Sequence, residues 1–145
     1  MRVSLCALVI VLAAGALAFA QGGEEQAIRQ AALDYLEGWY EGNVDRMDAA
    51  LHPDLAKRIV YPHPKTGRSM LNEATKSAML EYTRAGGGKD KAKEGTGNEI
   101  TILDVHGGMA SVKAVSPDYV DYIHLVKWNG EWKILNVLWE QRPKE

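Results

Sequence analysis

Four histidines are the side chains of this sequence best suited to acid–base chemistry, because an unperturbed imidazole titrates near neutral pH. They are His52, His63, His106 and His124. Their spacing contains no HxH, HxxxH or HExxH pattern, so the sequence predicts no metal site. We place His124 mid-strand on an inward face, where it could act as a general base or ligand donor, or as a hydrogen-bonded core histidine. His106 belongs to a turn.

His52 and His63 fall in predicted loops at the ends of a short helix and a short strand, near the expected mouth of a pocket. An imidazole in such a loop could contact a ligand. His52-Pro53-Asp54 could equally serve to end the helix, with Asp54 forming a local turn hydrogen bond.

Aromatic side chains form the second candidate group. Each of them alone fits a hydrophobic core, because aromatic rings bury large areas. Together they fit a pocket for a planar ligand, in which rings provide stacking walls and hydroxyl or imidazole groups orient the ligand. The group consists of Tyr35, Trp39, Tyr61, Tyr122 and Trp139.

Several other chemistries find no support in the sequence. The single cysteine, Cys6, lies in the N-terminal apolar run, and no G-x-S-x-G nucleophile motif is present. Gly88-Lys89 lacks the preceding glycine and the following hydroxyl residue of a phosphate-binding loop. The net charge of −2 is small and mixed, which argues against a nucleic-acid surface. No cofactor is indicated.

The N-terminus has the pattern of a secretory signal peptide. A basic Arg2 precedes a charge-free apolar run from residue 3 to residue 20, and Ala18-Phe19-Ala20 provides small residues at the cleavage site. The pattern predicts residues 1–20 as the signal peptide and 21–145 as one mature domain, secreted or periplasmic and free of the membrane. An uncleaved anchor is the alternative, because about 18 apolar residues could just span a bilayer.

The hydrophobic periodicity predicts helices first and strands afterwards. We expect helices over 24–41, 44–51 (capped by Asn43) and 72–84 (capped by Asn72), with a short strand at 58–61. The glycine- and lysine-rich stretch 86–97 is predicted to be a mobile loop. Strands are expected at 99–105, 109–115, 119–127 and 132–140. This order predicts a single α+β domain.

Asn129-Gly130 predicts a two-residue type I′ hairpin turn between the last two strands. An unbroken register would place His124, Tyr122 and Trp139 on the inward face. The opposite face would then carry Asp121, Ile123, Leu125, Ile134 and Leu138. Because this face is also largely apolar, we expect it to form a homodimer interface.

With these elements, the sequence resembles the nuclear transport factor 2-like superfamily and, within it, the putative lumazine-binding family. The segments that carry the resemblance are 34–43, 51–55, 102–105 and 120–134. The resemblance implies a cone, in which a curved, mostly antiparallel sheet wraps around about three N-terminal helices and encloses a pocket for a flat heterocycle.

The superfamily also includes ketosteroid isomerase, whose oxyanion-hole tyrosine corresponds to Tyr35 and whose protonated acid corresponds to His124. The stretch that corresponds to its aspartate base, 59–61, has no carboxylate. We therefore expect a small-molecule-binding protein with ligand contacts from the five aromatics, His52, His63 and His124. The alternatives are a dehydratase, isomerase or cyclase using His124 and Tyr35, and a protein-interaction module using the outer sheet face.

Overall fold

The computed structural model describes residues 4–89 and 97–143, with side chains from residue 22 onwards. Within these residues, three helices and six strands follow one another. They are α1 (Ser4–Glu41), α2 (Val44–Ala50), β1 (Leu51–Pro62), β2 (Ser69–Ala74), α3 (Lys76–Arg84), β3 (Glu99–His106), β4 (Met109–Val115), β5 (Tyr119–Trp128) and β6 (Glu131–Gln141). Residues 90–96 of the predicted mobile loop lie outside the described residues.

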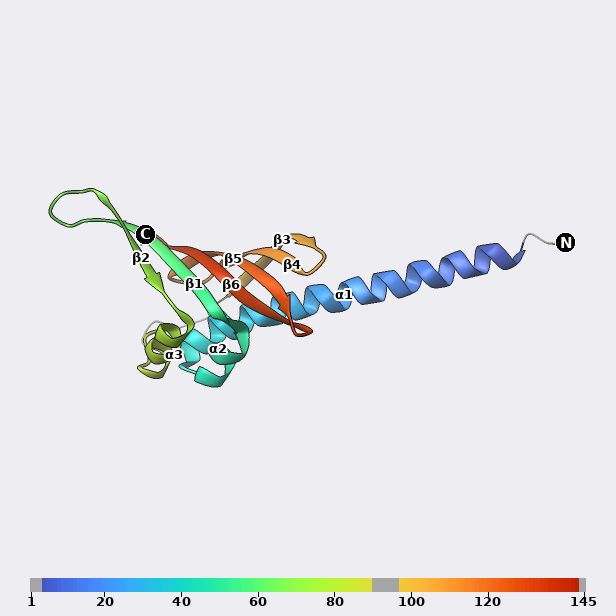
Figure 1. Ribbon diagram of the computed structural model, residues 1–145, viewed down its shortest axis with the longest axis horizontal. Coiled ribbons are helices and arrows are strands. Elements are labelled where there is room, and N and C mark those ends of the chain that lie inside the picture. The colour runs from blue at the N-terminus through green and yellow to red at the C-terminus, as the bar shows by residue number, and fades with distance from the viewer. Residues whose placement is uncertain (1–3, 90–96, 144–145) are drawn as a thin grey trace.

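Helix α1 starts about twenty residues before the predicted residue 24, and its N-terminal half projects away from the rest of the chain (Figure 1). Its C-terminal end agrees with the prediction, because Gly42 adopts a φ of +65°, which glycine tolerates at a helix end. Asn43 caps α2 by accepting a hydrogen bond from the backbone N–H of Arg46. The Arg46 guanidinium also pairs with three carboxylates of α1, Asp34, Glu37 and Glu41, and so ties α2 to α1.

The segment between α2 and α3 differs most from the prediction. Strand β1 begins directly after α2 and is twelve residues long, so His52-Pro53-Asp54 lies in a strand. Strand β2 was not predicted, and α3 begins at Lys76 with Thr75 as its cap, which leaves Asn72 in β2. Pro53 and Pro62 lie near the two ends of β1, where fewer ladder hydrogen bonds are lost.

The six strands form one open, curved sheet in the order β2-β1-β6-β5-β4-β3. Strand β1 runs parallel to β6, and all other neighbours are antiparallel. The four C-terminal strands form the predicted meander, with boundaries within one residue of the predicted ones. The concave face of the sheet covers the C-terminal half of α1, and α2 and α3 lie at one end of it (Figure 1). The α+β cone is thus confirmed.

The β5–β6 hairpin has the predicted turn but not the predicted register. Asn129 and Gly130 both have positive φ, and Trp128 pairs with Glu131, as predicted. A bulge in β6 then shifts the register between the Leu125–Ile134 pair and the His124–Asn136 pair. Beyond the bulge, Trp139 therefore pairs with Asp121, and Leu138 pairs with Tyr122, each on the side of the sheet opposite to the one that the unbroken register predicts relative to β5.

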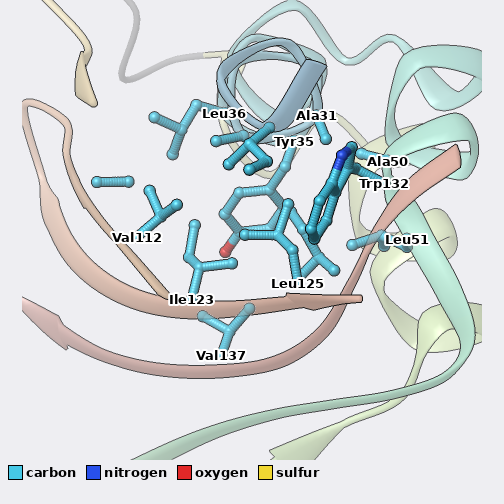
Figure 2. Packing of buried hydrophobic residues seen from close by; sticks show 14 of the residues in the cluster. Ala31, Tyr35, Leu36, Ala50, Leu51, Val112, Ile123, Leu125, Trp132 and Val137 are labelled. Atoms are coloured by element: carbon cyan, nitrogen blue, oxygen red, sulfur yellow. The ribbon is translucent and has the colours of Figure 1, made fainter. Parts of the chain in front are cut away.

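The hydrophobic core lies between α1 and the concave face of the sheet. Figure 2 shows Tyr35 and Leu36 extending from α1 toward Ile123, Leu125 and Val137 of the sheet. The predicted inner side of α1 is confirmed, because its apolar residues are buried. They are Ile28, Ala31, Ala32, Tyr35 and Leu36.

Candidate functional site

A cavity of about 340 Å³ opens between α1, α3 and one half of the sheet. Ligand pockets of this size are usually apolar, with a few polar groups that orient the ligand. This cavity fits that description, because most of its wall is aromatic or aliphatic. The residues that line it are Tyr35, Leu36, Trp39, Tyr40, Lys57, Ile59, Tyr61, Asn72, Ala74, Met79, Tyr82, Tyr119, Asp121 and Trp139.

A buried polar cluster of three side chains forms one part of this wall. The Tyr35 hydroxyl of α1 donates to Asp121 Oδ1 of β5 across 2.9 Å. Lys57 Nζ of β1 donates to the Tyr35 oxygen at 2.5 Å and to Asp121 Oδ1 at 3.1 Å. Asp121 is only 1% exposed. An ion pair between Lys57 and Asp121 is therefore held inside the domain, where each charge depends on the other.

Burial shifts the pKa values of two members of this cluster in opposite directions. It raises the pKa of Tyr35 well above its ordinary value, and the nearby Asp121 carboxylate raises it further. Burial lowers the pKa of Lys57, while Asp121 acts in the opposite direction. The cavity thus contains two titratable groups whose surroundings alter their acidity.

Aromatic rings surround the Lys57 ammonium. Its Nζ lies 4.5 Å from the centroid of the Trp139 ring and 5.3 Å from that of Tyr35. The Trp139 ring also packs edge to face against Tyr119, with 5.3 Å between the ring centroids. These contacts hold Trp139 beside the polar cluster, at a position where its ring can also meet a ligand.

Trp39 forms another part of the wall, and the glycine run after α3 packs on it. A Cβ at Gly87 would lie 2.5 Å from the Trp39 ring, and one at Gly88 would lie 2.5 Å from the Trp39 carbonyl oxygen. The glycines at 87 and 88 therefore permit a close approach of backbone to indole. The Trp39 indole N–H is buried and has no hydrogen-bond partner among the described residues.

The structure brings half of the predicted ligand contacts together. Tyr35, Trp39, Tyr61 and Trp139 all line the cavity. His52 does not line it: this side chain is buried against Trp128 and accepts the backbone N–H of Asp54. Its predicted alternative role in local hydrogen bonding agrees with this contact.

The other three predicted contacts lie elsewhere. His63 is exposed in the β1–β2 turn, where its Nδ1 accepts the backbone N–H groups of Lys65 and Thr66. Tyr122 and His124 lie on the outer face of the sheet, because the β5 residues that alternate with them, Asp121, Ile123 and Leu125, are the ones buried against the core. His124 lines a more open hollow on that face, together with His106. All four histidines thus lie outside the aromatic cavity.

The face predicted to form a dimer interface is mostly the one that packs on the core. Asp121, Ile123, Leu125 and Ile134 are almost fully buried on the inner side of the sheet, so they do not form an outer surface. Leu138 is the exception, with 56% of its surface exposed.

The sequence analysis missed the contributions of Lys57 and Asp121. Lys57 lies on the same side of β1 as Ile59 and Tyr61, because side chains alternate along a strand. Apolar residues at positions 59 and 61 therefore indicated that Lys57 also faces inward. We limited the strand to residues 58–61, which excluded it. Asp121 was placed on the correct strand but on the outward face, whereas its side of β5 packs on the core.

Two negative findings concern the described part of the chain. Among the residues whose side chains the structure describes, 22–89 and 97–143, no group of three or more His, Cys, Asp or Glu could hold a metal ion. In that same part of the chain, no helix is both long enough and apolar enough to cross a membrane.

Comparison with known proteins identifies the class to which this fold and cavity belong. A family model described as "Putative lumazine-binding" matches residues 23–140. The chain therefore belongs to this family, and its fold is that of nuclear transport factor 2-like proteins. A comparison with curated proteins finds no match.

Solved structures support the same fold. A nuclear transport factor 2-like protein of unknown function from Silicibacter pomeroyi DSS-3 is 14% identical, with a TM-score of 0.63 over 84% of this chain and 98% of that one. A similar protein from Methylobacillus flagellatus KT is 20% identical, with a TM-score of 0.62 over 83% and 94%. A protein from Novosphingobium aromaticivorans DSM 12444, described as a putative scytalone dehydratase, is 20% identical, with a TM-score of 0.53 over 85% and 87%. At these identities, the likeness concerns the fold alone.

Proposed function

We propose that this protein binds a planar, uncharged heterocyclic molecule in the aromatic cavity. The observation that carries the proposal is the composition of the wall: aromatic rings surround one buried donor–acceptor cluster, Lys57–Tyr35–Asp121. Rings stack on a flat ligand, and the cluster can orient it. Membership of the lumazine-binding family supports the same ligand class.

Tryptophan fluorescence tests this proposal, because Trp39 and Trp139 line the cavity. Lumazine- or flavin-like compounds should quench the emission saturably. Replacing Trp139 by alanine should weaken binding by about 1 to 3 kcal/mol, the range for stacking a base on an aromatic ring. Trp128→Ala is the matched control, because Trp128 lies outside the cavity and is half exposed. Absence of quenching by any planar heterocycle at millimolar concentration would refute the proposal.

A second candidate is an enzyme of the dehydratase, isomerase or cyclase type. It is favoured by the opposite pKa shifts of Tyr35 and Lys57, since such pairs often mark acid–base sites. The fold also matches the protein described as a putative scytalone dehydratase. In this chain the acid–base groups would be Tyr35 and Lys57, because the histidines lie outside the cavity. Turnover of a bound heterocycle by the wild type, lost in Tyr35→Phe, would favour the enzyme.

Export and dimerisation are further parts of the proposal. The signal-peptide pattern of residues 1–20 supports export, and the family match begins only at residue 23. Exposed apolar side chains on the outer sheet face support a homodimer. Tyr122 and Leu138 pair across β5 and β6 there, and 51% and 56% of their surfaces are exposed. The same surface would serve the alternative function, a protein-interaction module.

A further inference from the structure

The hydrogen bonds of Lys57 leave one of its donors unused. An ammonium group has three N–H donors. One contacts the Tyr35 oxygen and a second contacts Asp121 Oδ1. Lys57 lines the cavity, and no other hydrogen-bond acceptor among the described residues takes its third N–H. The cavity wall therefore carries a strong donor that is available to a ligand.

Asp121 offers the complementary acceptor. Both hydrogen bonds to its carboxylate, from Tyr35 and from Lys57, reach Oδ1. Oδ2 accepts no hydrogen bond from any described residue. It also keeps some exposure to solvent, because it is not one of the fully buried polar atoms that lack a partner. Because one carbon holds both oxygens, Oδ2 lies next to the atom that Lys57 contacts. A free donor and a free acceptor thus stand side by side in an aromatic cavity.

This pair selects among ligand edges by charge and by hydrogen bonding. The ammonium and the carboxylate neutralise each other, so the pair has no net charge to attract an ion. A ligand carboxylate would face Asp121, and a ligand ammonium would face Lys57. A lone carbonyl would leave Asp121 Oδ2 without a donor, and an unpaired buried acceptor is unfavourable. A carbonyl directly beside a ring N–H satisfies both groups at once.

We propose that the cavity recognises the lactam edge of a planar heterocycle, with Lys57 Nζ donating to the ring carbonyl and Asp121 Oδ2 accepting from the adjacent ring N–H. This inference rests on the proposed function and specifies the ligand class. Tyr35 is a positioning residue in this arrangement, because its hydroxyl holds Asp121 and accepts from Lys57. Trp139 stands against Lys57, where it can stack on the ligand ring.

Two isomeric probes test the inference, with affinities measured by tryptophan quenching and calorimetry. 6,7-Dimethyllumazine has its methyl groups on the far ring and keeps the lactam N–H groups. 1,3-Dimethyllumazine has the same mass and rings, but its methyl groups replace those N–H groups. The wild type should bind the 6,7-isomer about ten- to a hundredfold more tightly, the range for a hydrogen bond to a charged group.

The variant Lys57→Met/Asp121→Asn should lose this preference while still binding planar rings. Removing both charges together avoids an unpaired buried ion, so the double variant is expected to fold. The control Arg58→Met/Glu73→Gln removes an exposed ion pair between β1 and β2 and should keep the preference. Its pair is 2.6 Å apart and lies outside the cavity.

Three results would overturn the inference. Equal wild-type affinities for the two isomers would show that the cavity does not recognise the lactam edge, although the proposed binding of planar ligands would stand. A preference that persists in the double variant would show that methyl bulk is responsible. Failure of the wild type to bind any planar heterocycle would refute the proposed function, and the inference with it. Should the double variant not fold, equal wild-type affinities for the two isomers would still refute the inference.

Discussion

Removing the ammonium of Lys57 while keeping its volume is the most direct perturbation of the buried cluster. Lys57→Met leaves the Asp121 carboxylate, 1% exposed, with only the Tyr35 hydroxyl as a hydrogen-bond donor. Breaking a buried ion pair in this way typically destabilises a protein by about 3 to 5 kcal/mol, because one charge remains unpaired. The comparison variant is Arg58→Met, next to Lys57 on β1, which breaks the exposed ion pair with Glu73 of β2. Its loss of stability is expected to be about 0 to 1 kcal/mol.

Urea unfolding followed by circular dichroism measures this difference. With a slope of about 1 to 3 kcal/mol per molar urea, Lys57→Met should lower the midpoint by about 2 M, and Arg58→Met by less than about 0.5 M. Adding Asp121→Asn to Lys57→Met should restore at least half of the loss. Equal midpoints for Lys57→Met and Arg58→Met would refute the assignment of a desolvated ion pair.

Four further predictions concern other parts of the chain. Intact-mass analysis of exported protein should give an N-terminus at Gln21, and a full-length chain retained in the membrane would contradict this. Leu138→Asp on the outer face should convert a dimer into a monomer in sedimentation experiments, and a wild type that is already monomeric at micromolar concentration would remove the basis for the prediction. Burial raises the pKa of Tyr40 to about 12, so the contribution of its neutral hydroxyl to stability is present below pH 10 and is lost as the pH rises toward 12. In Tyr40→Phe, the free energy of unfolding should therefore fall by about 2 kcal/mol less over that pH range than in the wild type. Equal falls in the wild type and the variant would argue against this role of Tyr40. Gly88→Ala should destabilise the protein by about 1 to 3 kcal/mol, because the new Cβ would meet the Trp39 carbonyl oxygen. Gly108→Ala is the control: the nearest atom to its Cβ is 3.6 Å away, so its thermal unfolding midpoint should stay close to that of the wild type.

Local patterns were sufficient for much of the architecture. The inner side of α1 follows from apolar residues at three- and four-residue steps, such as Ile28, Ala32 and Tyr35. The C-terminal meander follows from period-two alternation and from Asn129-Gly130, whose positive φ values suit a type I′ turn. These signals depend on neighbouring residues in the chain, so a single sequence displays them.

Tertiary structure alone decided the composition of the site. The face on which Asp121 lies depends on which side of β5 packs against α1, and both faces of the hairpin are apolar, so alternation could not choose between them. The full length of β1, and with it the inward position of Lys57, depends on parallel pairing with β6, which lies some eighty residues later in the sequence. The Lys57–Asp121 pair therefore arises from two non-local alignments. Periodicity within a strand shows which residues share a side, but only the packed sheet determines which side faces the cavity.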